Sequence, residues 1–593
     1  MLSRIAYFVS LLVLCYSSFF FYPKWNKQGV EATISWDVSG YYWYLPAIFI
    51  YKDVKKLSFK DSIIAKYAPT GTELQQAMPL DNGNYVMKYS SGMAVMYLPF
   101  FVVAHVLAVP LGYPADGFSY PYQLAIQFGG LLVSLLGLWL LRRLLLLYYA
   151  DRVVAITLFL IACGTNYLNY AAVDSGMSHT WLFTIYVSLL LSTHYFFSTF
   201  RVRYAVLIGF LVGLATLTRP TEIISCLIPL MWGLDGFTRQ AFARYRALLV
   251  QHARLLLVSV VTASAVVFIQ FAYWKYVSGH WFVYSYGEQG FSWFHPHWYV
   301  YSFNYRTGWL TYCPMMLLAL AGFLLYVRNG KHRVAVIAFF LVSFYCVTAW
   351  DIWWYGGRAM VQSYAVISLP FAALVQWTIS RRALIWIFTA AAAVFCYLNI
   401  WIFVQYHGGG LYDGECMSRA YYWRVLGRWS APDDTRKLLD AADLFEGTPV
   451  SKTLLFEHRF DTCTGPEFVE TGEPGNKALL LNSVVSRTPA YKIPYSSKGP
   501  GWVRLQATFL SKEREENIWK MPTMSVRLDN GETYVKENFV RIGRFIKNGI
   551  RSTVFVDIKL PKQPYTHLTF VVWNQQTNKE IIVDDMQAWD IKE

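Results

Sequence analysis

The stretch YQLAIQFGGLLVSLLGLWLLRRLLLLY, residues 122–148, decides the fold of this chain. A helix needs about 20 mainly apolar residues to cross the hydrocarbon core of a bilayer. This stretch is longer, and its charged residues are Arg142 and Arg143, both near one end. It therefore predicts a membrane-spanning helix whose arginine-bearing end faces the cytoplasm, where basic residues accumulate in membrane proteins.

Eleven further apolar runs accompany this stretch along the chain. They cover residues 5–22, 90–111, 153–170, 178–199, 203–218, 221–234, 255–277, 309–327, 334–350, 359–379 and 383–405. The chain is 55% hydrophobic but only 15% charged, whereas soluble globular chains are about 25% charged. The bilayer is therefore part of its solvent. The net charge of +15 is expected in cytoplasmic loops, so nucleic acid is not an expected partner. The first run ends in Phe-Phe-Phe-Tyr-Pro rather than small residues, which favours an uncleaved helix.

Basic clusters between the runs predict the orientation of the helices. The positive-inside rule places five clusters in the cytoplasm: Arg142, Arg143 and Arg152; Arg201 and Arg203; Arg239, Arg244, Arg246 and Arg254; Arg328, Lys331 and Arg333; Arg381 and Arg382. Every crossing after residue 122 is then consistent with these clusters being cytoplasmic, provided that run 90–111, with its two prolines, lies in the outer interface. We expect eleven crossings in a bacterial inner (cytoplasmic) membrane. Residues 23–121 then form one external loop with surface helices, and the C-terminus is external.

The composition changes after residue 406. Residues 407–445 are amphipathic and aromatic, which is typical of a linker at the membrane surface. From 446 to 593 the pattern alternates between apolar and polar residues, with Gly, Pro and Asn turns between the runs. Expected strands begin at Leu454, Trp502, Ser552, Leu568 and Ile581. The fold class is thus an all-α polytopic membrane domain, residues 1–406, followed by an external β-sandwich. Cys416 and Cys463 could pair there if that part is outside the cytoplasm.

Two external acids are candidate catalytic residues. Asp37 stands in the motif Trp36-Asp-Val-Ser-Gly-Tyr41, just outside the first helix. A carboxylate there could take the proton of an acceptor hydroxyl, particularly if burial raises its pKa, and Tyr41 could contact a sugar. Asp174, in the turn before His179, could orient the acceptor or share a metal with Asp37. The alternative for both acids is that they cap the helix that follows.

Four external cations are candidate ligands of a donor phosphate. Lys88 directly precedes run 90–111, and Arg219, Arg306 and Arg358 lie at external helix ends, against the usual charge bias. Each needs a local anion, and a phosphate-linked donor would supply one. The alternatives are a lysine that extends to the interface, a lipid headgroup, or an acidic neighbour such as Glu222.

Two further groups of residues could bind sugar or metal. Glu288, with His295 and His297, lies in the loop 278–308 and could hold a divalent metal or simply line a polar rim. Glu288 is also a candidate contact of the acceptor. Trp353 and Trp354 could stack on sugar rings, or belong to an aromatic interfacial belt.

These motifs in this order resemble the GT-C superfamily of membrane glycosyltransferases, which includes the aminoarabinose transferases acting on lipid A and the protein O-mannosyltransferases. The resemblance covers roughly residues 1–405. It matches the first-loop acid to Asp37, the basic residue before a surface helix to Lys88, and a second external acid to Asp174. It also matches a Leu-Thr-Arg turn to Leu217-Thr-Arg219 and a long external loop to 278–308. Val38 stands where part of the family has a second acid, so a metal role at that point is not implied.

The resemblance implies an inverting glycosyltransferase at the external face of the membrane. Its donor would be a polyprenyl-phosphate sugar, and its acceptor a cell-envelope glycan, lipid or protein. No cofactor is implied with certainty, and a divalent metal stays open. The alternative is a flippase of lipid-linked sugars, which would need polar residues at the bilayer midplane. The spanning runs are almost free of charge, and this favours chemistry at the outer rim.

Overall fold

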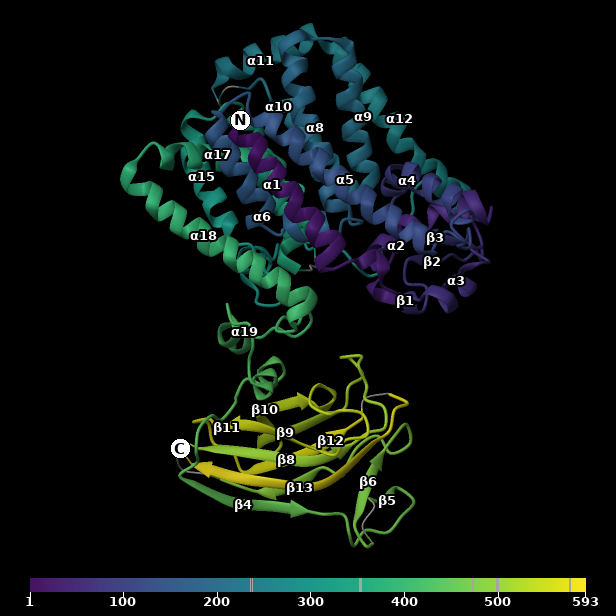
Figure 1. The fold of residues 1–593 in the computed structure, drawn as a ribbon, viewed down its shortest axis with the longest axis vertical. Helices are drawn as coiled ribbons and strands as arrows, with labels where there is room; N and C mark the ends of the chain where they lie inside the picture. Colours follow the sequence, from purple (N-terminus) through teal and green to yellow (C-terminus); the bar gives the residue numbers. More distant parts are fainter. Residues whose placement is uncertain are drawn as a thin grey trace. The chain divides into compact units, whose positions relative to one another are not determined.

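Each of the twelve apolar runs lies on a helix in the computed structural model (Figure 1), which describes residues 1–234, 236, 238–350, 355–471, 474–496, 501–574 and 577–592. The chain forms two units, a helical unit, Met1–Gly408, and a β unit, Gly409–Glu593. Five segments of the described chain are long and apolar enough to cross a membrane: Leu2–Asn26, Tyr120–Leu145, Ser178–Thr199, Ala253–Ser278 and Arg382–Gly409. Six shorter apolar helical segments accompany them: Gly92–Ala108, Val202–Thr218, Pro220–Met231, Met315–Asn329, Arg333–Ala349 and Tyr364–Ile379. The protein is therefore a multi-pass membrane protein.

The helices of the helical unit begin and end as follows. The longer ones are α1 (Leu2–Tyr16), α4 (Gly92–Ala108), α5 (Tyr120–Leu145), α6 (Asp151–Gly164), α8 (Ser178–Thr199), α9 (Val202–Thr218), α11 (Arg239–Gln251), α12 (Ala253–Ser278), α15 (Met315–Asn329), α16 (Arg333–Ala349), α17 (Tyr364–Ile379) and α18 (Arg382–Val404). The shorter ones are α2 (Trp36–Tyr42), α3 (Lys60–Tyr67), α7 (Tyr167–Ala172), α10 (Leu227–Met231), α13 (Trp298–Phe303) and α14 (Trp309–Tyr312).

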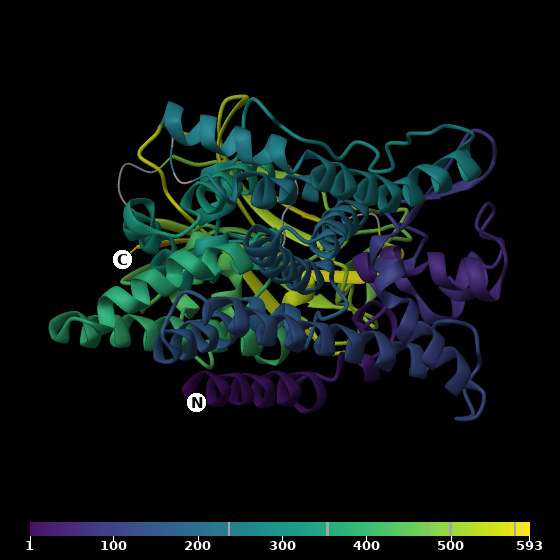
Figure 2. The same cartoon turned by 90° about the horizontal axis from the view of Figure 1, so that it is seen from above.

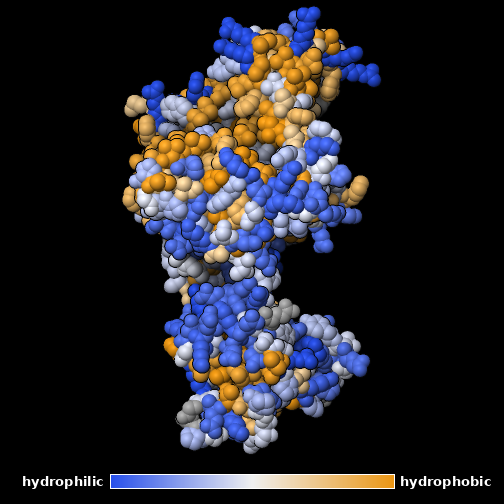
Figure 3. Space-filling model, turned by 90° about the vertical axis from the view of Figure 1, so that its right-hand side faces the viewer, coloured by the Kyte–Doolittle hydropathy of each residue, from blue (hydrophilic) through white to orange (hydrophobic). Residues whose placement is uncertain are grey.

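Small residues let two of these helices approach closely. A Cβ added at Gly209 of α9 would lie 2.2 Å from the carbonyl oxygen of Ser259 on α12, and one at Gly213 would lie 2.8 Å from that of Ala263. Such a Gly-x-x-x-Gly pair is a common means of packing helices within membranes. The outward faces are apolar as well, as expected for contact with lipid (Figure 3). Trp386 of α18, for example, is 76% exposed. The helix α18, drawn in green, lies at the edge of the helical unit (Figure 2).

The loop 23–121 gathers at one end of the helical unit (Figure 1). It contains α2, α3, the strands β1 (Pro69–Thr72), β2 (Ala77–Pro79) and β3 (Tyr85–Met87), and α4. One face of α4 is buried and packs mainly on α5, whereas Val103 and Val106 on the other face are exposed. Pro99 lies inside this helix. The hairpin β2–β3 leads directly into Lys88 and then α4.

The β unit is built from two antiparallel sheets. One has the strand order β10-β9-β12-β7, and the other has the order β11-β8-β13-β6-β5, with β4 paired to β13. The strands are β4 (Ser451–His458), β5 (Phe468–Glu470), β6 (Lys477–Leu481), β7 (Tyr491–Pro494), β8 (Trp502–Leu510), β9 (Thr523–Asn530), β10 (Thr533–Arg541), β11 (Ser552–Lys559), β12 (His567–Trp573) and β13 (Ile581–Lys592). Residues of both sheets, such as Leu505 of β8 and Phe570 of β12, belong to one buried apolar core.

The five strands expected from alternation are confirmed as β4, β8, β11, β12 and β13. The suggested pairing of Cys416 with Cys463 is wrong, because both thiols are free. Cys416 Sγ instead accepts a hydrogen bond from Arg541 Nη1 at 3.6 Å, and Cys463 packs against the apolar core.

Residues 409–445, which include α19 (Arg419–Val425), are held against the strands of the β unit. Asp440 is fully buried and forms ion pairs with Arg541 and Arg544, and Asp413 pairs with Arg544 at 2.6 Å. Removing one partner of a buried ion pair leaves an uncompensated charge, which costs about 3–5 kcal/mol.

We therefore expect a fragment of residues 409–593 to be more stable than one of residues 446–593, by about 3 kcal/mol or more. The shorter fragment lacks both acids that pair with Arg541 and Arg544. Urea unfolding followed by circular dichroism measures the difference. Glu446→Gln in the longer fragment is the control, because it breaks an exposed pair with Arg424 that contributes at most about 1 kcal/mol. Equal unfolding free energies for the two fragments would contradict this view.

Candidate active site

Asp37 lies in the first turn of α2, and both of its carboxylate oxygens are engaged. Oδ2 accepts a hydrogen bond from Arg358 Nη2 at 2.6 Å, and Oδ1 accepts one from the Tyr89 hydroxyl at 2.7 Å. Its side chain is 19% exposed. The cap position of α2 belongs to Ser35, and no side chain caps that end. The carboxylate is therefore used for contacts across the fold, and the helix-cap alternative does not describe it.

Two glycines position Arg358. It lies in the 3₁₀ segment Tyr355–Met360, in which Gly356 and Gly357 have φ angles of +59° and +61°, a region that other L-residues rarely adopt. A Cβ on Gly357 would lie 2.5 Å from the side chain of Trp309. The carbonyl of Gly356 accepts a hydrogen bond from Asn166 Nδ2 at 2.8 Å. The Gly-Gly-Arg sequence thus folds tightly against neighbouring helices and directs the guanidinium at Asp37.

Lys88 is held by its backbone on two sides. Its N–H donates to the carbonyl oxygen of Gln76 at 3.0 Å, and its own carbonyl accepts a hydrogen bond from Ser285 Oγ at 2.7 Å. The ammonium group lies near enough to Asp37 to lower its pKa. It makes no hydrogen bond or ion pair with any residue of the described chain, and it lies over the ring of Tyr89, 5.7 Å from the ring centre.

Arg219 reaches the same place from the end of α9. A Cβ on Gly92, the first residue of α4, would collide with Thr218 at 2.4 Å, so these two helix ends abut. The Arg219 guanidinium interacts electrostatically with Tyr41, Glu222 and Arg358. Its Nη1 is buried and has no hydrogen-bond partner among the described residues. A buried donor without a partner is costly, and an anionic ligand would relieve that cost.

Opposing effects act on the charge of Asp37. Burial by itself would raise its pKa, but the charge of Arg358, the hydrogen bond from Tyr89 and the charge of Lys88 together lower the pKa below its ordinary value. Asp37 is therefore ionised at neutral pH. This differs from the expectation that burial raises its pKa, since the cations brought in by folding outweigh desolvation.

Tyrosine rings form the wall of the site. The rings of Tyr41 and Tyr89 are 4.6 Å apart, and those of Tyr89 and Tyr286 are 5.8 Å apart. Burial, and next the charge of Asp37, raise the pKa of Tyr89 well above its usual value, so its hydroxyl stays protonated and donates. The sequence argument missed Tyr89 and Tyr286, although both stand in segments that it singled out, beside Lys88 and within the loop 278–308.

Asp174 occupies a second buried polar cluster. It accepts hydrogen bonds from Lys24 Nζ at 2.6 Å and from Asn169 Nδ2 at 2.9 Å. Burial would raise its pKa, but the charges of Lys24 and His407 lower it below the ordinary value. Its side chain does not cap α8, whose cap position is Met177. The short helix α7 joins the two clusters, because Tyr170, next to Asn169, donates to the carbonyl oxygen of Tyr355 at 3.0 Å.

The other candidates lie elsewhere or cannot be placed. Glu288 and His295 are exposed, and His297 is half-buried. The described part of the chain contains no group of three or more His, Cys, Asp or Glu residues that could hold a metal, so the loop does not assemble one. Arg306 is half-buried, and its N–H donates to Asn304 Oδ1 at 2.6 Å. Trp353 and Trp354 lie outside the described residues.

An apolar groove of about 490 Å³ lies between α9 and α12. None of its lining residues is charged: Phe196, Ile208, Gly209, Val212, Gly213, Thr216, Ile223, Cys226, Pro229, Leu230, Leu256, Ser259, Val260, Ala263, Ser264, Val267, Phe268 and Phe271. One end adjoins the site. Phe271 follows Gln270, whose Oε1 accepts a hydrogen bond from the N–H of Ser91, three residues after Lys88, and Thr216 is one turn before Arg219.

Fold and site together define a multi-pass membrane protein with a largely buried carboxylate, Asp37, beside the cations Arg358 and Lys88. No family model and no curated protein matches the chain. Among solved structures it is similar to the oligosaccharyltransferase of Archaeoglobus fulgidus in its apo form, at 14% identity and a TM-score of 0.34, over 55% of this chain and 48% of that one. It is also similar to the arabinosyltransferase EmbB of Mycobacterium smegmatis, at 10% identity and a TM-score of 0.33, over 84% of this chain and 63% of that one. Both are glycosyltransferases, the class that the motifs resemble.

The chain spans about half of the first of these proteins and less than two thirds of the second.

Proposed function

We propose that this protein is an inverting glycosyltransferase that moves a sugar from a polyprenyl-phosphate donor to an acceptor of the cell envelope at the external membrane face. One observation carries the proposal. Arg358 and Lys88 act on Asp37, and Arg219 acts on the neighbouring Arg358 and Tyr41, so three distant parts of the chain bring their cations to one place. The Lys88 ammonium and Arg219 Nη1 have no hydrogen-bond partner among the described residues.

The charges of the site fit a phosphodiester. The three cations face two acids, Asp37 and Glu222, which leaves one positive charge uncompensated. A polyprenyl-phosphate sugar carries one negative charge on its phosphate, and guanidinium groups bind phosphate oxygens with charge-assisted hydrogen bonds. The apolar groove between α9 and α12 offers a place for the lipid of such a donor.

The reaction would be a single displacement. The acceptor hydroxyl oxygen attacks the anomeric carbon while the bond from that carbon to the phosphate oxygen breaks, and the phosphate leaves with the electron pair. Asp37 accepts the hydroxyl proton. The cations stabilise the charge that grows on the leaving phosphate. Attack from the opposite side inverts the configuration at the anomeric carbon. Because Arg358 binds Asp37 in the free protein, a donor phosphate that draws Arg358 away would make Asp37 a stronger base.

The direct test uses purified protein in nanodiscs with a panel of labelled polyprenyl-phosphate sugars. We expect one donor to be consumed, with release of polyprenyl phosphate, when envelope glycan or glycolipid is added. Mass spectrometry of envelope glycans from cells with and without the gene would identify the sugar that is lost. Movement of lipid-linked sugar between leaflets without any transfer would instead support the flippase alternative.

The proposal includes a topology. We infer eleven crossings in a bacterial cytoplasmic membrane, with α4 at the outer interface and the β unit external as a β-sandwich. A reporter after Gly410 or near Gly112 should then be external, and one after Lys331 cytoplasmic. The two outer positions lie on either side of the crossings from α5 onward, so together they test whether the number of crossings between them is even. Cytoplasmic labelling near Gly112 would overturn the placement of α4 and shift every later crossing.

The low pKa of Asp37 predicts a flat pH profile. An ordinary aspartate titrates near pH 3.9, and Asp37 titrates lower, so kcat/KM should stay constant as the pH falls from about 7.5 to 5. In Arg358→Gln the charge that opposes burial is lost, so the pKa of Asp37 rises and activity should decline with falling pH within that window. Lys66→Gln, beside Asp116, is the control and should keep the flat profile. A wild-type decline that begins near pH 7 would contradict the assignment.

A further inference from the structure

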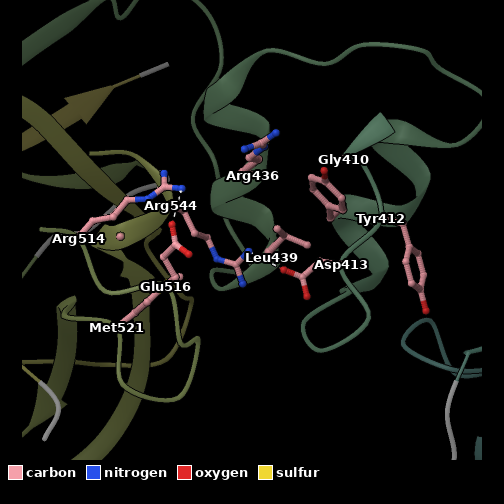
Figure 4. Close-up of a pocket in the computed structure, with 11 residues that line it drawn as sticks. Gly410, Tyr412, Asp413, Arg436, Leu439, Arg514, Glu516, Met521 and Arg544 are labelled. Carbon is pink, nitrogen blue, oxygen red and sulfur yellow. Dashed lines mark hydrogen bonds and ion pairs between the residues drawn. The ribbon is translucent and has the colours of Figure 1, made fainter. Parts of the chain in front are cut away.

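The β unit contains a cavity of about 360 Å³ far from Asp37 in the sequence. Its lining residues all belong to Gly409–Glu593: Gly410, Tyr412, Asp413, Tyr421, Arg436, Leu439, Arg514, Glu516, Met521, Gly543 and Arg544 (Figure 4). Arg436, Tyr412 and Asp413 come from the segment 409–445, whereas Arg514, Glu516 and Arg544 come from the strand region (Figure 4). The volume lies within the range of about 300–1,000 Å³ that small-molecule sites occupy.

Arg544 is a buried cation with hydrogen-bond donors to spare. Its side chain is 10% exposed, and Nη1 donates to Asp413 Oδ2 at 2.6 Å. Its Nη2 is buried and has no hydrogen-bond partner among the described residues. Since a guanidinium presents five N–H donors and a buried donor without a partner is costly, a ligand oxygen at Nη2 would be favourable.

Arg436 adds a positive charge that no acid of the described chain neutralises. Arg514 pairs with Glu516 at 3.2 Å, and Arg544 pairs with Asp413 and with Asp440, an acid outside the lining that it shares with Arg541. Arg436 makes no hydrogen bond or ion pair with the described residues. It lies in the 3₁₀ segment Asp433–Leu439 and projects between that segment and Gly410 (Figure 4). The lining therefore carries three arginines against two acids, an excess of one positive charge.

The rest of the lining suits a sugar more than a bare ion. Asp413 and Glu516 offer carboxylate oxygens that can accept from hydroxyl groups, and Tyr421 adds an aromatic ring to the lining. A ligand that matches all of these features has one anionic group, several hydroxyls and a compact ring.

We propose that this cavity binds a sugar residue that bears one carboxylate or phosphate group, as part of an acidic acceptor glycan. The inference rests on the proposed function, since it assigns the acceptor's chemical class to the β unit. The anionic group would lie between Arg436 and Arg544, and the hydroxyls would face Asp413 and Glu516.

The test is a titration of the full-length protein in nanodiscs, at low salt and without donor, with glucuronate, glucose 6-phosphate, glucose and inorganic phosphate. We expect glucuronate or glucose 6-phosphate to bind at least about tenfold more tightly than glucose or inorganic phosphate. Which of the two binds better distinguishes a carboxylated from a phosphorylated acceptor. Binding of inorganic phosphate as tight as that of glucose 6-phosphate, or of glucose as tight as that of glucuronate, would overturn the proposal.

Variants locate the binding. Arg436→Ala should weaken the binding of the acidic sugar about tenfold or more, and Arg436→Lys should keep part of it, because the charge is retained. Arg459→Ala, at a 61% exposed site outside the cavity, is the matched control and should leave affinity unchanged. Circular dichroism establishes that each variant is folded, and Arg436→Ala at wild-type affinity would overturn the proposal.

One further variant separates this proposal from the proposed function. Asp37→Asn lies in the helical unit and should bind the acidic sugar as the wild type does. Normal binding without any sugar transfer in the wild type would refute the transferase and leave the cavity assignment standing. Sugar transfer by a wild type that binds no acidic sugar at the cavity would refute the cavity assignment and leave the transferase standing.

Discussion

Replacement of Asp37 by Asn is expected to lower the turnover of sugar transfer by about 10²–10⁴-fold, the usual contribution of a general base. The amide keeps the size of the side chain, and its oxygen can still accept from Tyr89 or Arg358, but it cannot take a proton. Donor affinity should not weaken, because the variant frees Arg358 for the donor phosphate. Single-turnover rates and donor titration, measured on the same preparation, separate the two effects.

The loop 23–121 offers a matched control for this variant. Asp116 also accepts hydrogen bonds from a cation and a tyrosine, namely Lys66 at 2.9 Å and Tyr67 at 2.5 Å. Asp116→Asn therefore disturbs a similar ion pair in the same loop and should change turnover by no more than a few-fold. Near-normal transfer by purified Asp37→Asn would remove Asp37 as the base. Asp174, the other buried acid of the helical unit that the sequence nominated, would then be tested next.

The sequence identified the charged residues of the site but not their pairings. Lys88, Arg219 and Arg358 stood out because the positive-inside rule makes positive charge uncommon at external helix ends. Their convergence depends on packing that one sequence does not encode locally, since Asp37 and Arg358 are 321 positions apart. The cavity of the β unit was missed for the same reason, because Arg436 and Arg544 come together only through tertiary structure.

The same contrast appears in the β unit. β8, with its alternating burial, was predicted at its observed position, Trp502–Leu510. β9 was missed because six of its eight residues are buried and it is paired on both sides, so no clear alternation appears. β10 was missed because charged and polar residues such as Lys536 and Glu537 interrupt its pattern. Its place depends on pairing with β9, which no local pattern predicts.

The second large effect is expected at Lys88 and Arg219, because the Lys88 ammonium and Arg219 Nη1 have no hydrogen-bond partner among the described residues. Arg219→Ala and Lys88→Ala each remove a charge-assisted contact with the donor phosphate, which contributes about 1.5–3 kcal/mol. Donor affinity should fall about ten- to a hundred-fold, since 1.4 kcal/mol is a factor of ten. Lys88→Arg should recover part of the loss because the charge is retained. Isothermal titration of the donor against protein in nanodiscs gives these affinities.

Arg203→Ala is the matched control for Arg219→Ala, because Arg203 lies in the first turn of α9 and Arg219 directly follows the last residue of the same helix. Arg203 stacks on Tyr204 and lies at the end that basic residues mark as cytoplasmic. Its loss should leave donor affinity unchanged. If both α9 variants weakened donor binding equally, the loss of affinity would come from a disturbed helix or from a weaker general attraction to lipid. If Arg219→Ala and Lys88→Ala both bound the donor normally, the phosphate would not lie at Asp37. The catalytic assignment of that acid would then fail with it, because base and leaving group must meet at one anomeric carbon.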